Sequence, residues 1–162
     1  QDRIPGPFPI IAASGPSGTH VEAMAQGPGV VTGRSGVLGR VFLELEAYWP
    51  LNTTLWVKEF RAASPCYAYE VLRLLDLKAF NAGSAVPTLN RNHIHGLPYL
   101  IPPRACVEAY ERLALQLHRR ARLNEQQAQS LVTLRDTLLP RLISGQLRLP
   151  EAAAEDDLAL VT

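Results

Sequence analysis

The segment from Pro103 to Gly145 constrains the fold most, because it has the pattern of one long helix. A double proline precedes it, and the first helical position needs no backbone donor. Pro140 and Gly145 are expected to end the helix. Between these ends, residues recur at alternating spacings of three and four, as in a coiled coil. The members of this seam are Val107, Tyr110, Ala114, Leu117, Ala121, Asn124, Ala128, Leu131, Arg135, Leu138 and Leu142.

Such a helix is longer than a small domain needs for its own core. Over residues 103–139 it would measure about 55 Å at 1.5 Å per residue. We therefore expect another helix to pack along the seam. Asn124 lies in mid-seam, where a buried amide fixes the register of a coiled coil. The alternative is that Asn124 faces water on a kinked helix.

Composition indicates a soluble protein with a real core. Hydrophobic residues make up 47% of the chain, yet no apolar run is long enough to span a membrane. The first residues lack a basic region followed by an apolar stretch, so no signal peptide is expected. Cys66 and Cys106 fit neither a metal-ligand spacing nor a disulfide framework. We therefore expect a cytoplasmic protein with inert thiols and no membrane partner.

Charge is unevenly distributed along the chain. Residues 1–100 carry eight Lys/Arg and seven Asp/Glu, and residues 101–150 carry eight Arg and four acids. This basic segment is compatible either with an anionic partner or with an ordinary charged helix surface. Residues 151–162 hold four acids and no base, which is typical of a solvated tail.

The residues before the long helix have the pattern of a small, β-rich α+β body. Ser64 and Pro65 predict a helix start, with Ser64 as N-cap, and residues 78–83 predict a short helical turn. Runs of β-branched and aromatic residues predict strands at 9–13, 30–32, 39–45, 54–60 and 97–101. The predicted division is a globular body at 1–101, the long helix at 102–145 and an acidic flexible tail at 146–162.

The sequence contains no convincing catalytic constellation. His93 and His95 would share a face in a strand, but no Asp, Glu or Cys lies within ten residues to complete a metal site. Gly33, Gly36 and Gly39 resemble a phosphate loop without its Lys-Ser/Thr ending, so a tight turn is the preferred interpretation. The acids of the body are scattered, which disfavours a metal-dependent nuclease. We therefore predict a non-catalytic protein without a metal or cofactor of its own.

Four polar segments indicate DNA contacts instead: the Gly/Ser-rich loop at 14–20, the turn residues 34–40, residues 52–54 and residues 88–93. They are rich in Arg, Asn, Ser and Thr, which hydrogen-bond base edges and phosphates. For each segment alone, a structural turn is at least as compatible with the sequence, and Asn90 has the position of a helix cap. The candidate DNA-binding residues are Ser17, His20, Arg34, Arg40, Asn90, Arg91, Asn92 and His93.

Taken in order, these segments resemble the specificity subunit of type I restriction–modification enzymes. The resemblance covers the later part of one target recognition domain and the conserved helix after it. Each piece alone is weakly specific, whereas their order and spacing are highly specific. The matching residues are Gly33–Gly39, Tyr48–Val57, Gly83–Asn92, Leu97–Pro103 and Leu134–Gly145.

The resemblance implies a protein that reads double-stranded DNA and leaves the chemistry to partner subunits. In that family, two recognition domains each read half of a bipartite site, and two long helices pair antiparallel. Two methyltransferase subunits bind the specificity subunit, and restriction subunits join that core. S-adenosylmethionine, ATP and Mg are accordingly expected on those partners.

This chain has one recognition domain and one long helix. Because the resemblance begins partway into the recognition domain at 1–101, which would be incomplete at its N-terminus, we expect either a C-terminal piece of a longer specificity subunit or a half-size subunit that dimerises through its helix. A non-catalytic protein–protein adaptor, with the helix as its interaction device, is the alternative from another class. The near-neutral charge of residues 1–100 favours this alternative, because DNA-binding domains are usually more basic.

Overall fold

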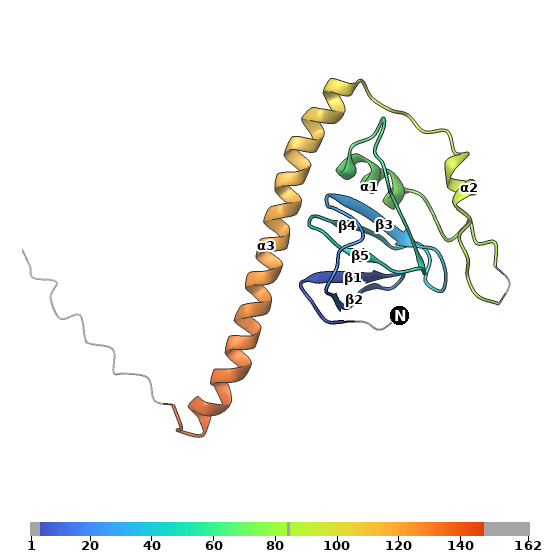
Figure 1. The fold of residues 1–162 in the computed structure, drawn as a ribbon. Coiled ribbons are helices and arrows are strands. Elements are labelled where there is room, and N and C mark those ends of the chain that lie inside the picture. Colours follow the sequence, from blue (N-terminus) through green and yellow to red (C-terminus); the bar gives the residue numbers. More distant parts are fainter. Residues whose placement is uncertain (1–3, 84, 148–162) are drawn as a thin grey trace, which may run out of the picture. The chain divides into compact units, whose positions relative to one another are not determined.

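The computed structural model describes residues 4–83 and 85–147 (Figure 1). Small β-sheets precede a long C-terminal helix, which confirms the α+β class. Contacts divide the chain into two compact units, one up to Arg119 and one from Arg120 on. The predicted acidic tail lies, from residue 148 on, outside the described residues. The elements are β1 (Phe8–Ala12), β2 (Gly15–His20), β3 (Gly29–Gly33), β4 (Val41–Glu44), β5 (Trp49–Pro50), β6 (Thr54–Trp56), α1 (Pro65–Leu74), α2 (Arg91–His95) and α3 (Arg104–Ile143).

Six short strands form two three-stranded sheets. In the first sheet, β1 pairs antiparallel with β2 and parallel with β5. In the second, β3 is central and pairs antiparallel with β4 and β6. All of β3 is buried, because its two faces meet other parts of the body, and α1 packs against β3 and β4.

The core of the body centres on Tyr48, whose side chain is fully buried. Ile11, Val31 and Ala25 complete the buried cluster, and Phe42 and Trp56 pack against it. Gly29 on β3 lies so close to Tyr48 that an added Cβ would overlap the phenol ring. Close packing of this kind fixes how the two sheets meet and so positions the loops at their ends.

Several predicted elements differ from the observed ones. Residues 14–20, interpreted as a loop, contain strand β2, and Gly15 and Gly18 take φ values of 120° and 91° within it. The strand predicted at 97–101 is wrong, since those residues form no strand or helix. Residues 78–83 include hydrogen-bonded turns, with Asn81 N donating to the Lys78 carbonyl at 3.2 Å.

Helix α1 begins at the predicted residue but has a different capping group. Pro65 occupies its first turn and Ser64 its N-cap position, yet Ser64 makes no side-chain capping hydrogen bond. Instead, Glu111 of α3 accepts a hydrogen bond from the Cys66 backbone N–H at 3.0 Å. A carboxylate at a helix N-terminus satisfies a free donor and complements the helix dipole.

Helix α3 runs without interruption for 40 residues, or about 60 Å. The prediction that Pro140 ends it is wrong, because the helix continues through this residue to Ile143. Pro140 has no N–H, so the carbonyl of exposed Asp136, four residues earlier, loses its usual helical donor, and only the last turn of the helix follows. The predicted stop at Gly145 is confirmed by its φ of 72°, with Gly145 N donating to the Leu142 carbonyl. None of the described helices is long and apolar enough to cross a membrane.

Candidate nucleic-acid interface

Hydrogen bonds join polar segments that are far apart in the sequence. The Arg34 backbone N–H donates to the Thr53 carbonyl at 2.8 Å, and the Arg34 carbonyl accepts from Leu89 N at 2.8 Å. The Arg40 guanidinium donates from Nη1 to the Ser14 carbonyl at 2.7 Å. The loop after β3 is therefore bonded directly to the β5–β6 turn and to the segment that leads into α2, while Arg40 holds the β1–β2 turn.

The predicted DNA-binding residues from the first half of the chain differ in exposure and in the contacts that their side chains already make. Arg34 is exposed, so its guanidinium is available to a ligand. Arg40 is also exposed but already bonds Ser14, which gives it a structural role. Ser17 is half-buried on β2. His20, at the end of β2, stacks on Trp49 with ring centroids 4.1 Å apart.

The other four candidates belong to the start of helix α2. Asn90 accepts a hydrogen bond from Asn92 N at 3.0 Å, so its alternative interpretation as a helix cap is confirmed. The side chains of Arg91, Asn92 and His93 are exposed. His93 and His95 lie on a helix and not on a strand, and two helical residues in this relation point about 200° apart. They therefore share no face.

A cavity of about 410 Å³ opens beside Arg34. Its lining comes from both sheets and from the turns between them, and includes His20, Trp49, Asn52 and Trp56. Asn52 belongs to a predicted polar segment, but neither it nor the two tryptophans are among the predicted DNA-binding residues. The sequence does contain a signal for this cavity, because two tryptophans lie on either side of the polar turn.

The sequence stretches that carry the candidate arginines contain no acids, although the body as a whole is near neutral. Residues 23–43, 47–58 and 77–107 contain no Asp or Glu, and they hold Arg34, Arg40 and Arg91. The seven acids of residues 1–100 all lie outside these stretches. The net charge of the whole body therefore conceals sequence stretches that are basic, and basic stretches favour an anionic partner.

The seam of α3 falls into two parts. Val107 and Ala114 are buried within the first unit, where Tyr110 packs edge-on against Tyr67 of α1 with ring centroids 6.2 Å apart. Farther along, Leu117 and Leu131 are 71% and 65% exposed. The exposed or half-exposed remainder of the predicted seam is Ala121, Asn124, Ala128, Arg135, Leu138 and Leu142.

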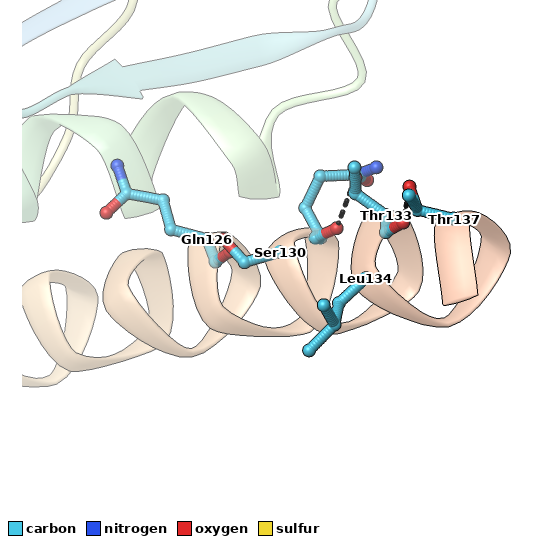
Figure 2. A pocket seen from close by; sticks show the side chains of 6 residues that line it. Gln126, Ser130, Thr133, Leu134 and Thr137 are labelled. Atoms are coloured by element: carbon cyan, nitrogen blue, oxygen red, sulfur yellow. Dashed lines mark hydrogen bonds between the residues drawn. The ribbon is translucent and has the colours of Figure 1, made fainter. Parts of the chain in front are cut away.

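Another stripe of α3 is polar and uncharged. Figure 2 shows Gln126, Ser130, Thr133 and Thr137 along a shallow depression that Leu134 also lines. The hydroxyl of Ser130 donates to the Gln126 carbonyl at 2.9 Å, and that of Thr137 donates to the Thr133 carbonyl at 2.8 Å. Because these two hydroxyl groups already donate to carbonyls of the helix backbone, they do not indicate a ligand site.

Sequence comparisons add no family to this picture. Neither the protein-family models nor the curated proteins give a match to the chain. Among the residues that the structure describes, no group of three or more His, Cys, Asp or Glu side chains could hold a metal ion. The candidate functional features of the described residues are the polar segments around Arg34, the adjoining cavity and the exposed apolar residues of α3.

Proposed function

We propose that this chain is the DNA-reading part of a type I restriction–modification system, either a specificity half-subunit or a portion of a specificity subunit. The observation that carries the proposal is that the backbone of Arg34 is hydrogen-bonded both to Thr53 and to Leu89. That bonding links exposed arginine and asparagine side chains from separate parts of the sequence. Arginine and asparagine are the side chains that make bidentate contacts with guanine and adenine in the major groove.

The distribution of charge supports the same proposal. Arg34 and Arg91 lie in stretches without acids, so a phosphate backbone would meet no repulsion from their sequence neighbours. Asn92 and His93, both exposed, add donors and acceptors for base edges. Arg40 and Asn90 would act indirectly, because they hold the turns that present the other side chains.

Helix α3 would supply the assembly function. Its exposed leucines need an apolar partner, and we propose that this partner is α3 of a second copy of the chain. Two recognition bodies would then belong to one assembly and read two half-sites. Methylation and cleavage would be carried out by methyltransferase and restriction subunits, which would supply S-adenosylmethionine, ATP and Mg.

DNA binding by the full chain tests this proposal. Fluorescence anisotropy with a pool of randomised duplexes should show affinity that falls steeply with salt. The variant Arg34→Ala/Arg91→Ala should bind at least about tenfold more weakly, because it loses two charged contacts. Arg112→Ala/Arg122→Ala, which removes two exposed arginines of α3, is the matched control and should bind as the unmodified chain does. Salt-independent binding, or equal loss in both variants, would contradict the proposal.

A protein–protein adaptor is the second candidate, and the exposed apolar residues of α3 favour it. Those residues call for a protein partner and carry no information about DNA. The same measurements distinguish the two functions. An adaptor would self-associate or bind a protein and show no affinity for duplex DNA even at low salt.

A further inference from the structure

The cavity beside Arg34 has the size and lining of a site for a flat ring. Its volume of about 410 Å³ lies within the range of roughly 300–1,000 Å³ that small-ligand sites occupy. Trp49 and Trp56 contribute aromatic surface, and Met24 adds a flexible apolar side chain. Asn52 and Arg34 supply polar groups at the same site.

Strand pairing holds the aromatic surfaces in position. Trp49 is paired with Ile10 in the first sheet, and Trp56 is paired with Val31 in the second. The His20 ring stacks on Trp49 with an interplanar angle of 24°. Both indoles are only half-buried, so each keeps ring surface that a ligand can cover. A rigid aromatic surface of this kind stacks any nucleobase, since every base has a π-face.

The polar groups select for a base that carries a phosphate. Asn52 is exposed on the turn between β5 and β6, and its amide offers a donor and an acceptor to the edge of a base. Arg34 provides a cation for the adjoining phosphate. No carboxylate occurs among the described residues that line the cavity, so nothing there favours an amine. The Thr54 hydroxyl is already used, because it donates to the Leu51 carbonyl at 2.6 Å.

We propose that this cavity receives a nucleobase that has left the stack of bound DNA. The proposal rests on the DNA-binding function above and adds a second mode of recognition to it. Contacts from the Arg34 and Arg91 segments would hold the duplex, while one extruded base would stack against Trp49 or Trp56. Extrusion costs least for an unpaired base, so DNA containing such a base should bind most tightly.

Tryptophan fluorescence can test the proposal directly, because both tryptophans of the chain line the cavity. The probes are two fluorescein-labelled DNA hairpins with the same paired stem, one fully paired and one with a single adenine inserted as a bulge. Anisotropy of the label reports DNA binding, and tryptophan emission reports occupation of the cavity. We expect the bulged hairpin to bind at least about fivefold more tightly and to quench the tryptophans more strongly.

A substitution at the rim separates the base contact from the duplex contact. Asn52→Ala should abolish the preference for the bulged hairpin and leave affinity for the paired hairpin within about twofold. Gln116→Ala, which removes an exposed amide on α3, should leave both affinities and the preference unchanged. A preference that survives Asn52→Ala intact would overturn the assignment of Asn52 to base recognition.

The outcomes distinguish this inference from the proposed function. Equal affinity for the two hairpins, with unquenched tryptophans, would overturn the base site and leave DNA binding in place. No anisotropy change with either hairpin at low salt would overturn the proposed function and the base site together. Quenching by free dAMP without quenching by the bulged hairpin would overturn DNA as the source of the base.

Discussion

Glu111 of α3 forms a hydrogen bond to the start of helix α1. One of its carboxylate oxygens accepts a hydrogen bond from the Cys66 backbone N–H at 3.0 Å. Cys66 itself is completely buried. Burial raises the pKa of the Cys66 thiol to about 12, and the rise is reinforced by a hydrogen bond between the thiol itself and the Glu111 side chain and by the negative charge of Glu111. The charge of Glu70 acts in the same direction, and Arg119 opposes it.

The expectation of buried, inert thiols is wrong for Cys106, which is exposed, so the two thiols should differ in reactivity. At pH 8 the raised pKa keeps Cys66 protonated, and only a thiolate is nucleophilic, whereas Cys106 is exposed. Iodoacetamide followed by mass spectrometry should show rapid alkylation of Cys106 and none of Cys66. Raising the pH should increase the thiolate fraction of Cys66 about tenfold per unit until the pKa of about 12 is reached. The controls are Cys106→Ser, which should remove the rapid reaction, and Cys66→Ser, which should retain it; comparable alkylation of both thiols would disprove the prediction.

At the scale of elements, α1 depends on α3 for its capping group. Replacing Glu111 by Ala removes the acceptor for Cys66 N, and we expect a loss of about 1–2 kcal/mol in the free energy of unfolding. Glu111→Gln should cost less, since its amide oxygen can still accept. Urea unfolding followed by circular dichroism measures both changes. The loss of negative charge should also lower the pKa of Cys66 and speed its alkylation.

Glu108→Ala provides the control for this substitution. Glu108 lies on the same helix and forms an exposed ion pair with Arg104 at 2.7 Å. Exposed pairs of this spacing contribute about 0.3–0.5 kcal/mol, so the control should cost much less than Glu111→Ala. Equal costs for the two variants would mean that Glu111 does not stabilise the start of α1.

The sequence predicted the elements whose own residues determine them. The long helix, α1 and the buried strand β3 have clear periodicity or continuous apolar runs. Strand β2 was missed because Gly15–His20 consists of small and polar residues, and its pairing with β1 holds it extended. The strand expected at 97–101 does not form, because an apolar run also needs a partner edge.

The candidate site was predictable only in part, because it too depends on residues that are distant in the sequence. Composition marked the polar segments around Arg34 and Asn90, since residue type alone indicates which groups can contact DNA. Their connection depends on backbone hydrogen bonds between distant residues, such as Arg34 with Leu89. The cavity likewise combines side chains from both sheets. No local pattern encodes such combinations, so the tryptophans were not selected.

At the scale of the whole molecule, α3 has two parts that differ in burial. Its first turns belong to the first unit, and Val107 and Ala114 are buried there. From Arg120 on, every described residue of the helix is exposed or half-exposed. Apolar side chains outside the predicted seam, including Leu134 and Leu139, are also exposed. The exposed apolar surface of α3 is therefore wider than the predicted seam with its spacings of three and four. This width is compatible with more than one partner helix.

Self-association tests whether a second copy covers this surface. Leu117→Glu/Leu131→Glu places charges in the seam, and we expect the dimer dissociation constant to rise at least about 100-fold, because four leucines per dimer lose their burial. Analytical ultracentrifugation over a concentration series measures this constant. Gln126→Glu/Thr133→Glu adds the same charge about half a turn from Leu117, on the polar stripe, and should leave association unchanged. If the unmodified chain sediments as a monomer at every concentration, the partner helix must belong to another polypeptide, and pairing between two copies is excluded.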